Sequence, residues 1–187
     1  MYMQSELLEM GFGYVGKDVK VFKKSSLINC CNIFLGDGCQ IDDFVHIIAS
    51  APVHIGRRVH IACFTSIAGG GEVTLDDYCG LSAGCRIISG TENFMGEGMT
   101  NPCIPAKFRS VLRSFVTIRR HAILGTNTIV YPGVTIDDGV ATGAGAVVNK
   151  DLDAWGLYMG APAKRIKSRP SERILELEKQ LIAEYGY

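Results

Sequence analysis

Large aliphatic residues recur at every sixth position along most of the chain. Counted from Val15, with short links and one interruption left out, the sequence divides into 18 six-residue units, and the first position is Val, Leu or Ile in 17 of them. The fifth position is small in 17 units as well. A period of six fits neither an α-helix nor a single alternating strand. It predicts a solenoid with three short sides per turn, in which one large and one small residue of each side point inward.

The six-residue units are themselves grouped in threes. The first residues of successive groups lie 20 positions apart from Val15 to Leu75, which is three units and a two-residue link. The pattern then fails and resumes at Ile118. The fold class predicted is therefore an all-β parallel solenoid, formed by residues 15–92 and 116–153.

The segments outside the repeat are expected to cap or flank the solenoid within a single domain, residues 1–187. Solenoid ends expose unpaired strand edges and need caps. Residues 1–14 are expected to form an N-terminal helical cap, since a short helical stretch there stops at Gly11. Residues 154–187 are expected to form an irregular tail and then an amphipathic C-terminal helix after Pro170. The apolar stripe of that helix comprises Ile174, Leu177 and Leu181.

The interruption, residues 93–115, shows neither a strand period nor a helix period. Loops this long in a compact fold usually carry function. Several members are apolar, so we expect the segment to pack against something. We interpret it as an inserted active-site loop. Its large apolar members are Phe94, Met95, Met99, Ile104 and Phe108.

Composition narrows the function classes. Lys and Arg number 19, as do Asp and Glu, so the net charge is zero, which argues against nucleic acid or an anionic membrane as the partner. No apolar run approaches the roughly 20 residues of a membrane helix, and no secretion signal is visible at the N-terminus. Seven irregularly spaced cysteines indicate thiols in a reducing compartment, so a cytoplasmic location is expected. Four of them occupy small fifth positions and are expected in the core: Cys31, Cys39, Cys79 and Cys85.

The repeat, followed by the motif GAPAKRIK, resembles the hexapeptide-repeat acyltransferases, whose fold is a left-handed parallel β-helix. The resemblance spans nearly the whole chain. It implies that acetyl-CoA or another acyl-CoA is the co-substrate, lying between neighbouring subunits of a homotrimer and parallel to the solenoid axis. Two glycines would let the pantetheine arm approach the backbone, and cations of the tail would meet the phosphates. The expected cofactor-binding residues are Gly125, Gly143, Ala161, Lys164, Arg165 and Lys167.

The inserted loop indicates the branch of that family. Several members that acetylate hydroxyl groups carry a histidine base on this loop, and here the loop has none. The chain is more similar to N-acyltransferases of nucleotide-linked amino sugars, of the anthrose-pathway type. Those enzymes are expected to pair a serine with a glutamate ten residues later, as in Ser82 and Glu92. The resemblance implies acylation of a nucleotide-linked amino deoxysugar for surface polysaccharide biosynthesis, with Asn93 and Phe94 contacting the substrate.

The chemistry of acyl transfer predicts a role for each of these residues. Glu92 is the candidate base, and we expect shielding by Phe94 and Met95 to raise its pKa. Ser82 would hydrogen-bond either the acceptor amine or the developing oxyanion, and the sequence does not choose between them.

Two other functions stay open at this point. One is an O-acetyltransferase acting on a sugar hydroxyl, with His60 or His121 of a neighbouring subunit as base. The other is a non-catalytic scaffold. No metal is expected, because the close histidine pair typical of zinc-binding β-helix enzymes is missing. The acyl group, the nucleotide and the sugar are not determined by the sequence.

Overall fold

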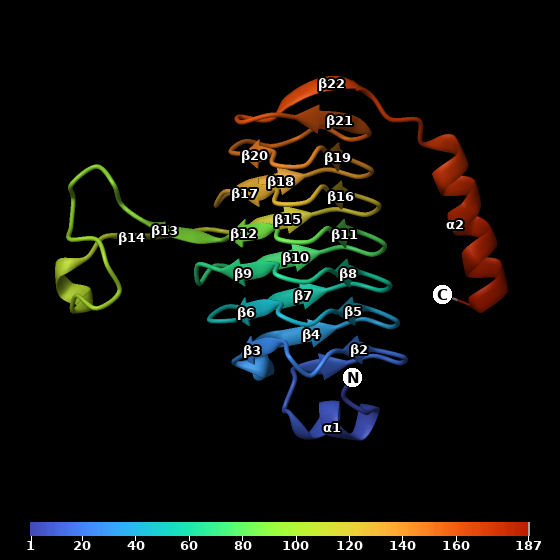
Figure 1. The fold of residues 1–187 in the computed structure, drawn as a ribbon, viewed down its shortest axis with the longest axis horizontal. Helices are drawn as coiled ribbons and strands as arrows, with labels where there is room; N and C mark the ends of the chain where they lie inside the picture. Colours follow the sequence, from blue (N-terminus) through green and yellow to red (C-terminus); the bar gives the residue numbers. More distant parts are fainter. Residues whose placement is uncertain (187) are drawn as a thin grey trace.

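Three parallel sheets form the walls of a prism and run along its length (Figure 1). The computed structural model describes residues 1–186. The sheet that we call sheet A contains β1 (Tyr14–Val15), β4 (Ile33–Leu35), β7 (Val53–Ile55), β10 (Val73–Leu75), β15 (Val116–Ile118) and β18 (Val134–Ile136).

The other two walls are built in the same way. Sheet B contains β2 (Lys20–Val21), β5 (Gln40–Ile41), β8 (His60–Ile61), β11 (Gly80–Leu81), β16 (Ile123–Leu124), β19 (Ala141–Thr142), β21 (Gly156–Met159) and β22 (Lys164–Ser168). Sheet C contains β3 (Ser26–Ile28), β6 (His46–Ile48), β9 (Ser66–Ala68), β12 (Arg86–Ile88), β17 (Ile129–Val130) and β20 (Val147–Val148). The chain visits A, B and C in turn, so each turn of the solenoid adds one short strand to each wall.

Strand register follows the predicted period. Val15 pairs with Leu35, Leu35 with Ile55 and Ile55 with Leu75. Leu75 then pairs with Ile118, so the stack continues across the inserted segment without a gap. The solenoid predicted from the six-residue repeat is therefore confirmed, and the insertion leaves the prism as an excursion between two adjacent turns.

The interior is a column of aliphatic side chains with small residues at the corners. Cys39, Cys79 and Cys85 are buried as predicted, and burial raises the pKa of all three thiols. The prediction for Cys31 is wrong, because this side chain is exposed. The reason is local: the chain leaves the repeat after β3 and forms a 3-10 turn, η1 (Cys30–Asn32), so the inward-facing alternation breaks there.

Different elements close the two ends of the prism. Helix α1 (Gln4–Glu9) lies at the end formed by the first strands and buries Leu7 (Figure 1). At the other end, the tail was expected to be irregular, but it forms two regular strands. Its strands β21 and β22 pair antiparallel, and β22 forms the last strand of sheet B.

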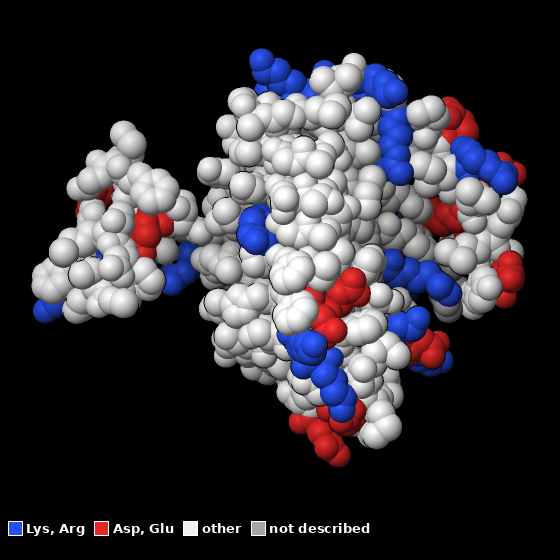
Figure 2. Space-filling view, viewed as in Figure 1, with Lys and Arg blue, Asp and Glu red and all other residues white. Residues whose placement is uncertain are grey.

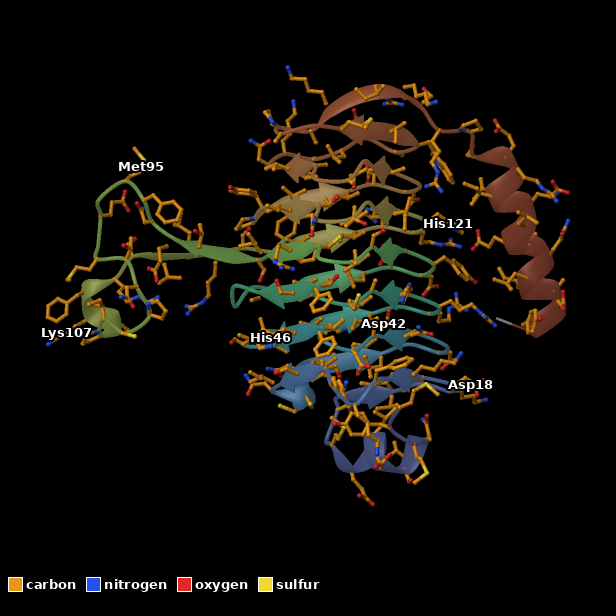
Figure 3. All side chains as sticks on the ribbon, in the orientation of Figure 1. Asp18, Asp42, His46, Met95, Lys107 and His121 are labelled. Carbon is orange, nitrogen blue, oxygen red and sulfur yellow. The ribbon has the colours of Figure 1, made fainter. Side chains whose placement is uncertain are left out.

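The inserted segment forms an arm that projects from the prism (Figure 1). Its base is an antiparallel hairpin of β13 (Gly90–Glu92) and β14 (Val111–Arg113), and its outer part carries a 3-10 turn, η2 (Ala106–Phe108). No strand period is visible in this segment of the sequence, because each strand of the hairpin has only three residues. Figure 3 shows Met95 and Lys107 on the part of the arm farthest from the prism.

Helix α2 (Glu172–Tyr185) confirms the predicted C-terminal helix and runs along one flank of the prism (Figure 1). Its buried Glu178 accepts a hydrogen bond from Arg120 and pairs with His121 at 3.0 Å between Oε2 and Nε2. Within residues 1–186, neither helix is long and apolar enough to cross a bilayer.

The Glu178 contacts predict how the helix is held. Glu178→Gln is expected to lower the free energy of unfolding by roughly 1–3 kcal/mol, because a charged acceptor serving two partners becomes a neutral amide. Thermal denaturation would show a lower Tm, and limited proteolysis would cut α2 sooner. The matched control is Glu176→Gln, since Glu176 is exposed and pairs only within the helix. Equal effects of the two substitutions would contradict a specific role for Glu178.

Candidate active site

One corner of the prism, between sheets B and C, carries Ser82 and two of the six predicted co-substrate residues. Ser82, Gly125 and Gly143 directly follow β11, β16 and β19, so they occupy the same place in three successive turns. Their backbones are linked in order, since Ser82 N–H donates to the Leu124 carbonyl and Gly125 N–H to the Thr142 carbonyl. Strands of neighbouring turns lie about 4.8 Å apart, so the column is roughly 10 Å long.

The two glycines add no side chain of their own to this column, although the Met159 side chain lies against Gly143. A Cβ at Gly125 would lie 2.6 Å from the Thr142 carbonyl oxygen, so packing between turns requires glycine there. A Cβ at Gly143 would meet Met159 at 3.0 Å. The backbone at the two glycines is half-buried, and the lack of side chains there is suited to a thin ligand lying along the axis.

A basic region lies at the end of the prism beyond the column. Lys164, Arg165 and Lys167 are all exposed on β22. Figure 2 shows Lys and Arg side chains at the end of the prism that β21 and β22 occupy. A hollow of about 300 Å³ is lined there by Lys150, Lys164 and Arg165 together with Asp151 and Asp153. Ala161 lies in the turn between β21 and β22 and is exposed.

Glu92 lies at the base of the arm and pairs with Arg109. The guanidinium of Arg109 donates from Nη2 to Oε1 of Glu92, and both side chains are mostly shielded, at 18% and 17% exposure. The Arg109 hydrogen bond is the main cause that lowers the pKa of the Glu92 carboxyl below its usual value. Glu92 Oε2 and Arg109 Nε are buried without a hydrogen-bond partner among the described residues.

The expected shielding of Glu92 by its apolar neighbours is wrong. Phe94 and Met95 are 78% and 87% exposed in the single chain, and Arg109, not apolar packing, sets the charge of Glu92. The pKa is therefore lowered where we expected it to be raised. Asn93 is buried, with its amide donating to Glu97 Oε2 at 2.7 Å and its carbonyl oxygen accepting from Met95 N–H at 2.7 Å. In this chain Asn93 shapes the arm, and its contact with substrate stays a prediction.

Ser82 and Glu92 are not brought together within one chain. Ser82 precedes β12 at the corner between sheets B and C, whereas Glu92 follows β12 on the arm. The whole width of sheet C separates them. The Ser82 corner and the arm of one chain are thus two separate candidate half-sites.

The histidines are engaged elsewhere. His60 Nε2 lies 3.0 Å from Asp42 Oδ2 on the outer face of sheet B. His121 is held between α2 and the corner of sheets A and B, and Figure 3 shows it on the flank of the prism that faces α2. Burial lowers the pKa of His121. Neither histidine is near the arm of its own chain.

Two grooves of the prism lie apart from the predicted residues. One of about 410 Å³ runs over the outer face of sheet A, along Phe34, His54 and Asp77. The other, of about 460 Å³, lies between α2 and the prism at Tyr78. Ser82 and Glu92 line neither groove.

Sequence reasoning missed Arg109. The signal for it was the hairpin at the base of the arm, which places the start of β14 beside the end of β13. Once that pairing is known, a cation near Glu92 is expected on the opposite strand or just before it.

Comparisons with known proteins agree on one family of enzymes, although no family model matches the chain. The dTDP-4-amino-4,6-dideoxy-D-glucose acyltransferase of Escherichia coli is 40% identical over 174 residues, which cover 92% of this chain and 90% of the relative. A putative lipopolysaccharide biosynthesis O-acetyl transferase, WbbJ of Escherichia coli K12, is 33% identical over 135 residues, which cover 72% of this chain and 60% of the relative.

Among solved structures, AntD, an N-acyltransferase from Bacillus cereus in complex with dTDP and coenzyme A, shares the fold over its full length. The TM-score is 0.92 at 35% identity, and the match covers 98% of both chains. The solved AntD variants replace a serine and an aspartate ten positions after it. The expected glutamate at the second position is therefore wrong for AntD, whereas this chain has Glu92 at the same spacing from Ser82. The chain belongs to the hexapeptide-repeat acyltransferases with a left-handed parallel β-helix, in the branch of the dTDP-4-amino-4,6-dideoxyglucose N-acyltransferases.

Proposed function

We propose that this chain transfers an acyl group from acyl-CoA to the amino group of a dTDP-linked amino deoxysugar. The observation that carries the proposal is the column of Ser82, Gly125 and Gly143, in which two of the three residues have no side chain and which leads to the basic strand β22. It offers a backbone surface for a pantetheine arm and cations for phosphates. The E. coli relative and AntD bear names of this activity.

We further propose that the working enzyme is a homotrimer in which each site combines two chains. The arm exposes several large apolar side chains, and exposed apolar patches of this kind mark contacts with another protein. A second copy of the chain is the partner that would complete both half-sites, since its arm would carry Glu92 to the Ser82 corner of its neighbour. The exposed apolar members of the arm are Phe94, Met95, Met99, Phe108 and Leu112.

The residues suggest how the reaction would proceed. Acyl-CoA supplies a thioester carbonyl and a thiol leaving group. Glu92, ionised at neutral pH, would pair with the ammonium of the sugar through its unpartnered oxygen Oε2 and accept its first proton. Ser82 would hold either the amine or the carbonyl oxygen by a hydrogen bond. Amide formation releases a second proton, which balances the charge of the departing thiolate.

The wider setting is part of the same proposal. All seven cysteines are unpaired, including the exposed Cys31 and Cys103, which suits a reducing compartment. We place the enzyme in the cytoplasm, with its product used for surface polysaccharide biosynthesis.

A direct assay tests the activity. Acetyl-CoA and longer acyl-CoA thioesters are offered with dTDP-4-amino-4,6-dideoxyglucose or with a dTDP-sugar that has a hydroxyl at the same carbon, and products are detected by mass spectrometry. We expect the acyl mass only on the amino sugar, and a loss of about 10²- to 10⁴-fold in Glu92→Gln.

The same assay separates the alternative activity. Acylation of the hydroxyl sugar, lost on replacement of His60 or His121, would favour an O-acetyltransferase like the one for which WbbJ is named. No acyl product with any donor would contradict both enzyme proposals.

A further inference from the structure

We propose that Arg109 is a positioning residue, which fixes Glu92 through an ion pair to one carboxylate oxygen and leaves the other oxygen without a hydrogen-bond partner until the amino group of the substrate arrives. The proposal rests on the proposed function, because it assigns Glu92 to the amine. Arg109 comes from the segment between η2 and β14, and Glu92 ends β13, so the pair spans the two sides of the arm at its base.

The geometry divides the two oxygens of Glu92. Oε1 accepts from Arg109 Nη2, and Oε2 is buried without a hydrogen-bond partner among residues 1–186. A buried carboxylate oxygen that makes no hydrogen bond loses free energy, so such positions in folded proteins usually await a ligand or water. A donor arriving at Oε2 would complete the pair, and the ammonium of an amino sugar is such a donor.

The arm holds Arg109 in place by its backbone. Asn93 N–H donates to the Ser110 carbonyl at 2.8 Å. Since Asn93 follows Glu92 and Ser110 follows Arg109, this bond holds the two backbone segments together next to the ion pair. Met99 N–H donates to the Phe108 carbonyl at 2.9 Å on the other side of Arg109. Flanked in this way, the guanidinium can orient Glu92 although Arg109 itself need not touch the substrate.

Other charged groups near Glu92 act more weakly. Arg113 on β14 lowers the pKa of Glu92 only through space, as the smallest of five causes, and the Asn101 backbone lowers it less than Arg109 does. The nearby carboxylate of Glu97 is bound to the Asn93 amide. Arg109 is therefore the group whose loss should change the charge and the orientation of Glu92 most.

The test compares Arg109→Gln, Arg109→Lys and the control Arg113→Gln in full-length protein, with the amine-acylation assay run across pH. Arg109→Gln is expected to lower kcat/KM about 10- to 100-fold at neutral pH, since a small misplacement of a reacting group costs that much. Glu92 should then stay protonated to higher pH, so the acid limb of the profile should move upward. Arg109→Lys should recover part of both effects, and Arg113→Gln should change neither.

A double substitution separates positioning from general damage. If Arg109 acts through Glu92, adding Arg109→Gln to Glu92→Gln costs nothing further. The proposal would be overturned if the losses in kcat/KM of the two single variants multiplied in the double variant. It would also be overturned if the acid limb of the Arg109→Gln pH profile coincided with that of the wild type. Activity of the wild-type enzyme on the amino sugar is measured in the same series, so a failure of the proposed function is seen separately. Arg109→Lys serves as the control for misfolding, because it keeps the positive charge beside Glu92 and is expected to preserve the fold of the arm.

Discussion

Chains carrying Ser82→Ala and chains carrying Glu92→Gln are expected to be nearly inactive alone and to regain activity when assembled together. The reason is that one chain keeps Ser82 and Glu92 on opposite sides of sheet C. In a ring of three, every mixed trimer holds one ordered pair of neighbours with an intact serine and an intact glutamate. Tandem-tagged mixed trimers should therefore show about one third of the wild-type activity.

The complementation assay has a clear opposite outcome. If each site used Ser82 and Glu92 of the same chain, mixed trimers would be as inactive as either parent. The control is a set of mixed-tag trimers that carry Ser82→Ala in every chain, which should stay inactive at any tag combination. Sedimentation of the purified species checks that three chains are present.

A second large effect is expected from Gly71→Ala, at the point where the arm returns to the prism. An added Cβ at Gly71 would lie 1.6 Å from the Ser114 carbonyl oxygen and 2.6 Å from that of Ser89. Both neighbours are backbone atoms, so relief requires moving the hairpin base. We expect a loss of about 3 kcal/mol of stability, hence a fall in Tm of roughly 6–12 °C, and a larger loss of activity as the arm is displaced.

Gly80→Ala is the matched control. Its added Cβ would meet only Cδ1 of Ile123 at 2.8 Å, the flexible end of a side chain. We expect a change in Tm of no more than about 2 °C, because side-chain adjustment and the lower entropy of the unfolded chain nearly cancel. Differential scanning calorimetry of both variants decides the matter, and equal shifts would contradict the close contact at Gly71.

The solenoid could be predicted because its signal is local and repeated. Leu35, Ile55 and Leu75 lie at equal spacing. A single aliphatic residue does not identify a fold, but the regular series of them predicts the solenoid. The same reasoning failed at Cys31, where one turn at the end of the stack departs from the repeat. It also failed for the tail, since the antiparallel pairing of β21 with β22 happens once and leaves no period.

The candidate site was predictable only in part, for a different reason. Ser82 and Glu92 were inferred from the resemblance to amino-sugar N-acyltransferases, and the structure tests neither role. The pairing of Glu92 with Arg109 depends on a hairpin of two three-residue strands. The two residues lie 17 positions apart in a segment without periodicity. The charge state of Glu92 follows from that contact, so an argument from neighbouring residues alone reached the opposite direction for its pKa.

The strand β22 has a consequence for how these molecules behave in concentrated solution. A parallel solenoid offers, at its last turn, backbone groups on which another solenoid could stack, and repeated stacking would build a fibre. Sheet B ends instead in an antiparallel strand with exposed Lys164, Arg165 and Lys167. Like charges on two such ends repel each other, so the strand that we expect to bind phosphates also keeps the molecules from polymerising end to end.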